Sequence, residues 1–89
     1  MNDTPNRRHP IALADPRTRS YTEPQVAALL AEACERGRKF GLIWPSATTD
    51  SVVDGRVLVR FGNAPTSTVL NLLSLLLDHE KVEGGPWEP

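Results

Sequence analysis

The sequence predicts a small α+β domain in which two helices pack on a β-hairpin, in the order helix, strand, strand, helix. Three observations predict it. Residues 21–40 join a helix-start signal to apolar residues at helical spacing, residues 51–61 place a tight turn between alternating apolar residues, and residues 66–80 are rich in leucine at helical spacing. We assign residues 21–83 to this single domain, since 89 residues suffice for one core.

Residues 1–20 are predicted to form a flexible basic arm. They contain three prolines and four arginines, and their only apolar cluster is residues 11–14. Frequent proline with low hydrophobicity disfavours regular structure at a terminus. The alternative is that Ile11 and Leu13 dock on an exposed part of the core or on a neighbouring subunit.

The first helix is predicted to start after Thr22 and to stop at Gly41. Thr22 and Gln25 match a capping box, in which each side chain pairs with the backbone of the other residue. Apolar residues then recur at helical spacing from Val26 onward. Gly37 lies on this apolar face, where the absence of a side chain is expected to let another stretch of backbone approach closely.

The β-hairpin is predicted from Asp54-Gly55, because this dipeptide between β-branched residues is typical of a two-residue type I′ turn. With that turn, Val52 lies opposite Val57. One face of the hairpin then carries Val52, Val57, Val59 and Phe61. The other face carries Val53, Arg56, Leu58 and Arg60.

Regular strand pairing is expected to stop near Ser51. Continued further, the same register would bring Asp50 opposite Val59 on the apolar face, where a carboxylate is costly. Residues 45–51 are therefore predicted to be mostly loop. Residues 42–44, Leu-Ile-Trp, can add a third short strand before it.

The second helix, over residues 66–80, is predicted to be the central element of the fold. At about 100° per residue its apolar side chains cover roughly 220°, about twice the width that one core contact needs. The expected solvent side carries Asn71, Ser74, Asp78 and Lys81. Because one small subunit cannot cover so wide an apolar arc, we expect the protein to associate with itself as a homodimer, or with another protein.

The predicted protein-interaction patch is centred on Leu70, Leu73 and Leu77. It is flanked by Trp87, which lies in a Gly/Pro-rich tail over residues 84–89. A terminal tryptophan either folds back as a plug or serves as a recognition anchor, and the sequence leaves both alternatives open.

No catalytic or metal-binding pattern is found in the sequence. The two histidines, His9 and His79, and the single cysteine, Cys34, match no metal-ligand or nucleophile–base spacing. No pair of carboxylates is arranged for acid–base chemistry. We therefore expect a protein without enzymatic activity, metal or other cofactor.

Nucleic-acid binding is the alternative function. Arg7 and Arg8 of the arm and Arg56 and Arg60 of the hairpin can form a basic strip. The formal net charge of −1 gives no general attraction to phosphates. Aromatic residues also do not alternate with basic ones, as they do in stacking platforms.

A cytoplasmic location is expected. One cysteine excludes an internal disulfide framework. No run approaches the roughly 20 apolar residues of a membrane span, and the N-terminus lacks an apolar signal region, so no membrane partner is expected. By analogy of size alone, the chain fits a small regulatory accessory protein of a bacterium or phage.

Overall fold

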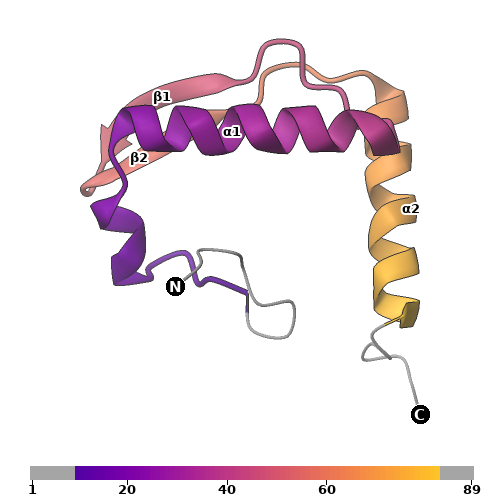
Figure 1. Ribbon diagram of the computed structural model, residues 1–89, viewed down its shortest axis with the longest axis horizontal. Coiled ribbons are helices and arrows are strands. Elements are labelled where there is room, and N and C mark those ends of the chain that lie inside the picture. The colour runs from indigo at the N-terminus through magenta and orange to yellow at the C-terminus, as the bar shows by residue number, and fades with distance from the viewer. Residues whose placement is uncertain (1–9, 83–89) are drawn as a thin grey trace.

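The computed structural model describes residues 10–82 and has the predicted order of helix, strand, strand and helix (Figure 1). Residues 1–9 and 83–89, which include Arg7, Arg8 and Trp87, lie outside the described residues. The elements are the 3-10 helix η1 (Pro16–Ser20), α1 (Glu23–Gly37), the 3-10 turn η2 (Arg38–Phe40), β1 (Thr48–Val53), β2 (Arg56–Arg60) and α2 (Thr66–Val82).

The predicted capping box starts α1. The backbone N–H of Gln25 donates to Thr22 Oγ1 at 3.3 Å, and that of Thr22 donates to Gln25 Oε1 at 2.8 Å. Gly41 ends the helical region with a φ of +78°, a left-handed conformation that glycine adopts readily. Gly37 is buried, and a Cβ built on it would lie 3.1 Å from Leu42 Cβ. The chain therefore folds back closely over Gly37, as predicted.

The hairpin contains the predicted type I′ turn. Asp54 and Gly55 have φ values of +53° and +76°, as both central residues of this turn require. Val52 lies opposite Val57, in the predicted register. The local turn signal was therefore sufficient to set the first residue pairs of the hairpin.

A β-bulge resolves the conflict predicted near Ser51. Regular pairing breaks between Thr49 and Val52, and it resumes with Thr49 opposite Val59. The extra residue in β1 keeps Asp50 from that position. Asp50 instead pairs with Arg60, with 3.1 Å between Oδ1 and Nη2. Because pairing resumes, β1 begins at Thr48, within the segment that was predicted to be loop.

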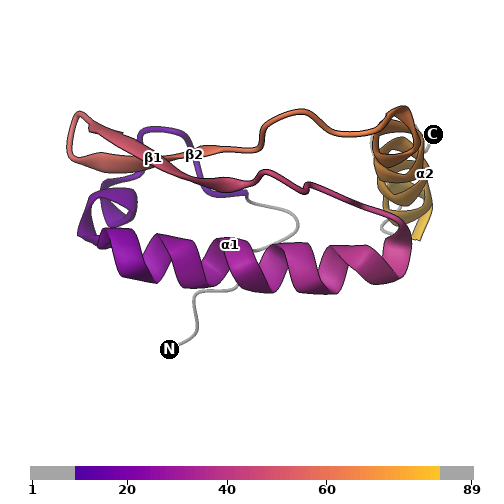
Figure 2. The ribbon, with the colours of Figure 1, turned by 90° about the horizontal axis from the view of Figure 1, so that it is seen from above.

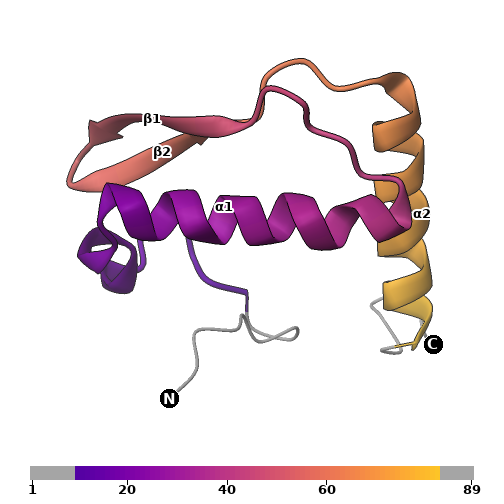
Figure 3. The same cartoon turned by 45° about the horizontal axis from the view of Figure 1, so that its top comes forward.

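α1 lies along the hairpin, as Figures 2 and 3 show, and contacts both of its strands. Thr49 of β1 also donates a hydrogen bond to the Glu23 carboxylate at the start of α1. α2 crosses the far end of this layer and, of the described elements, contacts only η2. Only one of the two helices therefore packs on the hairpin, and the predicted packing of the second helix there is not found.

Two polar side chains join α2 to the segment after α1. Thr68 is 2% exposed, and its Oγ1 accepts from Ile43 N and donates to Ile43 O, both at 3.0 Å. Asn71 Nδ2 donates to Gly41 O at 3.0 Å. We call these contacts the polar joint. They correct the prediction that Asn71 faces solvent, because its amide hydrogen-bonds the carbonyl of the turn at Gly41.

The polar joint also explains why residues 42–44 do not form the third strand. A strand would use both backbone groups of Ile43 for a neighbouring strand. In the structure those groups bind the side chain of Thr68 instead. Among residues 10–82 the sheet accordingly has two strands.

Residues 10–20 differ from the predicted flexible arm. Pro16–Ser20 form η1, in which the Asp15 side chain accepts a hydrogen bond from the backbone N–H of Arg17, and η1 contacts β2. Ile11 is 37% exposed and Leu13 is 93% exposed, so the alternative that both dock on the core is not supported for Leu13. The arm prediction for residues 1–9 concerns positions outside the described residues.

The hydrophobic core is small. Of residues 10–81, whose side chains the structure describes, Leu42 is the one buried hydrophobic residue, with 7% exposure. The rings of Trp44 and Phe61 make a tilted contact, with centroids 5.1 Å apart and an interplanar angle of 49°. Much of the apolar surface of the fold is therefore left uncovered.

Replacing Thr68 with valine is expected to destabilise the fold by about 1–3 kcal/mol, since a side chain of similar shape would leave the backbone groups of Ile43 without partners. Urea unfolding at one fixed protein concentration measures the loss. Ser67→Ala, at the exposed neighbouring position, is the control and should change stability by less than about 0.5 kcal/mol. Equal losses in the two variants would contradict the role given to the joint.

Candidate interaction surface

The exposed apolar residues of α2 lie on one continuous strip of the helix. Each is between 50% and 62% exposed, and at about 100° per residue they span about 120° of the helix surface. We call this set the leucine stripe: Val69, Leu70, Leu73, Leu76 and Leu77.

The polar joint determines which side of α2 the leucine stripe occupies. Thr68 and Asn71 face η2 and the segment after it, and Leu72 and Leu75 on the same side are half-buried. Leu73 lies nearly opposite this side on the helix. The stripe therefore points away from the rest of the described fold.

The stripe contains all three residues that were predicted to form the interaction patch. Leu70, Leu73 and Leu77 line one hollow along α2, together with Ser74, Asp78 and Lys81. The prediction omitted Val69 and Leu76 from the patch, although they lie on the same face. Their spacing around Leu73 was the signal that could have identified them. Trp87, the fourth predicted interface residue, lies outside the described residues.

Charged residues on α2 are confined to its end. The first turn has no acidic residue, and the last turns carry Asp78, His79, Glu80 and Lys81. A partner that lies along the leucine stripe therefore meets an uncharged surface first and a charged one near the C-terminus. The two ends of the surface therefore differ in charge, with the uncharged end at the N-terminus of α2 and the charged end at its C-terminus.

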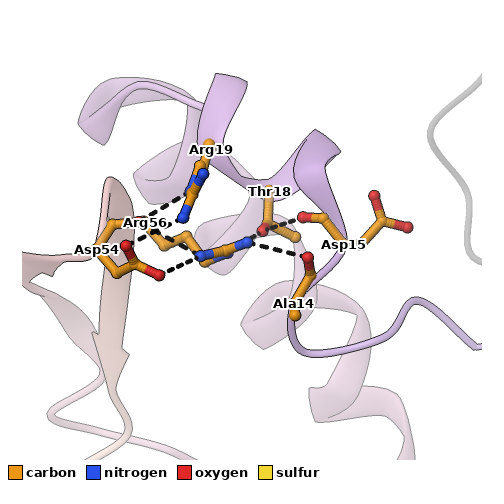
Figure 4. A network of polar contacts seen from close by, with 6 residues as sticks. All are labelled: Ala14, Asp15, Thr18, Arg19, Asp54 and Arg56. Atoms are coloured by element: carbon orange, nitrogen blue, oxygen red, sulfur yellow. Dashed lines mark hydrogen bonds and ion pairs between the residues drawn. The ribbon is translucent and has the colours of Figure 1, made fainter.

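The hairpin arginines of the nucleic-acid alternative have partners within the chain. Arg56 donates to Ala14 O at 3.0 Å, to Thr18 Oγ1 at 2.6 Å and to Asp54 Oδ2 at 3.0 Å, and its side chain is 16% exposed (Figure 4). Arg60 pairs with Asp50 at 3.1 Å. Arg7 and Arg8, the other two residues of the predicted basic strip, lie outside the described residues.

The contacts at the hairpin tip hold the N-terminal segment on the fold. Arg19 donates to both Asp54 O and Asp54 Oδ1, at 3.1 Å and 3.0 Å, so Asp54 bridges Arg19 and Arg56 (Figure 4). Arg56 in turn reaches Ala14 and Thr18 on either side of the start of η1. This tip network explains why Pro16–Ser20 are ordered.

The pKa of the Asp15 carboxyl is clearly lowered from its ordinary value. Hydrogen bonds from the side chain and the backbone N–H of Arg17 lower the pKa of the Asp15 carboxyl from 3.8 to about 2. The shift favours the charged carboxylate, which is the form that caps η1.

Residues 10–82 contain no group of three or more His, Cys, Asp or Glu side chains arranged to hold a metal ion. In the same residues no helix has both the length and the apolar character needed to cross a membrane.

Comparisons with protein-family models, with curated proteins and with solved structures find no match for the chain.

The Asp15 carboxyl is expected to titrate near pH 2 in the folded protein. Because its pKa is lowered, its stabilising effect on η1 is complete above pH 3.8 and is lost as the pH falls toward about 2. An NMR titration of the side-chain carboxyl carbon measures the midpoint. Arg17→Ala should move the midpoint back toward 3.8, whereas Arg36→Ala on α1 should leave it unchanged. A midpoint near 3.8 in the unaltered protein would contradict the pairing.

Proposed function

We propose that the protein is a small non-enzymatic interaction or regulatory module that acts through the leucine stripe and associates with itself. The observation that carries the proposal is the exposure of five apolar side chains on one face of α2, in a fold with one buried hydrophobic residue among residues 10–81. Contiguous exposed apolar surface of this kind is typical of protein–protein interaction sites.

The hydrophobic effect supplies the driving force for association. Burial contributes roughly 25 cal/mol per Å² of apolar surface, so covering a half-exposed leucine contributes on the order of 1 kcal/mol. Several such residues on one helix face can offset part of the entropy lost on association. No charged residue precedes Asp78 on α2, so little desolvation opposes docking along the stripe.

The hairpin adds no argument for nucleic-acid binding. Arg56 and Arg60 each form an ion pair with a carboxylate of the same hairpin, which reduces the positive charge offered to phosphates. We therefore place protein association first. We also propose a cytoplasmic location, with which the free thiol of Cys34 agrees.

The Leu73→Glu variant tests the proposal, because it places a charge at the centre of the stripe. Sedimentation across a range of concentrations should show a dimer for the unaltered protein and a dissociation constant raised by at least about 30-fold, roughly 2 kcal/mol, for the variant. Circular dichroism checks that both remain folded.

Val52→Glu is the matched control for this experiment. Val52 is 59% exposed, but it lies on the hairpin, so the same apolar-to-charged change should leave the dimer intact. A strictly monomeric unaltered protein at high concentration would overturn the proposal. A salt-dependent DNA mobility shift that persists in Leu73→Glu would favour the nucleic-acid alternative instead.

A further inference from the structure

We infer that the leucine stripe binds the same stripe of a second copy, and that the two α2 helices pair antiparallel about a two-fold axis at Leu73. The inference rests on the proposed function and adds the occupant of the surface and its orientation. The evidence for the pairing is the spacing of the exposed apolar residues along α2.

The stripe is symmetric in sequence about Leu73. Leu70 and Leu76 lie three residues before and after it, and Val69 and Leu77 lie four residues before and after it. A two-fold axis through Leu73 and perpendicular to the helix reverses the chain direction. It places Leu70 against Leu76 of the second copy, Val69 against Leu77, and Leu73 against Leu73. Each apolar side chain thus meets an apolar side chain, as a self-complementary two-fold interface requires.

The ends of α2 follow the same symmetry. Thr66 and Glu80 each lie seven residues from Leu73, and seven residues are within about 20° of two full turns, so all three lie along the middle of the stripe. In the antiparallel pair, Glu80 reaches the N-terminus of the other α2. A helix N-terminus favours a negative charge, and α2 has no acidic residue of its own in its first turn.

A parallel pair is disfavoured by the same charges. It would bring Glu80 beside Glu80 of the second copy, at helix ends that already carry partial negative charge. It would also align the two helix dipoles side by side. Because the acidic residues of α2 lie at its C-terminal end, the charges favour the antiparallel arrangement over the parallel one.

The position of α2 in the fold leaves room for this pairing. The helix stands at one end of the molecule and extends past α1 (Figures 1 and 3), while the polar joint turns its other side toward η2. A second α2 can therefore lie along the stripe without displacing α1 or the hairpin. Binding to a different surface of the second copy would be head-to-tail, and nothing in such contacts would require the symmetry about Leu73.

Disulfide trapping tests the orientation. Two chains are prepared in a Cys34→Ser background, one with Thr66→Cys and one with Glu80→Cys, so that no native thiol competes. The chains are mixed, oxidised with a glutathione buffer and measured as intact proteins by non-reducing mass spectrometry. The antiparallel pair predicts a mixed disulfide between the two variants, several-fold more abundant than either disulfide between identical chains, because helices at packing distance bring facing Cα atoms within bridging range.

Val52→Cys in the same background measures disulfides formed by random collision, since Val52 is exposed on the hairpin. Disulfides between identical chains at both positions would show a parallel pair and would overturn the orientation while leaving self-association intact. A dimer in sedimentation without disulfides above the Val52→Cys level would show that another surface pairs, and would overturn the inference. A monomer would overturn the proposed function together with it.

Discussion

Thr68 and Asn71 of α2 hydrogen-bond the backbone of Ile43 and Gly41, and the placement of the second helix depends on these contacts. Turning α2 to bury the leucine stripe against the body would break all of them. An unpaired buried backbone group costs about 1–3 kcal/mol, which is comparable to the gain from burying a leucine. The joint thus offsets the tendency of a leucine-rich helix to turn inward, and it leaves the stripe available for an external partner.

The features that depend on adjacent residues were predictable from the sequence. The capping box at Thr22, the helix stop at Gly41 and the turn at Asp54-Gly55 each follow from two or three neighbouring residues, and the structure confirms them. The exposed face of α2 was predicted in part, because helical periodicity shows that Leu70 and Leu73 share a face. Periodicity does not show which part of a wide apolar arc packs within the chain.

The features that were not predicted depend on pairs of residues far apart in the sequence. Asn71 was placed on the solvent side because it is polar, but its amide matches a carbonyl in the turn after α1. The segment around Thr18 was expected to lack regular structure, yet Arg56 reaches it from the hairpin. The register of a hairpin gives the face on which an arginine lies, and the partner of that arginine depends on the tertiary fold.

The β-bulge near Asp50 has a consequence for how copies of the protein meet. A two-stranded hairpin has unpaired backbone groups on both outer edges, and such edges can act as templates for continuous stacking of strands into fibrils. The extra residue in β1 interrupts the regular row of these groups, and the charged pair beside it adds a barrier to a neighbouring strand. Growth by strand addition is thereby hindered, so contact through a helix can end in a closed assembly of finite size.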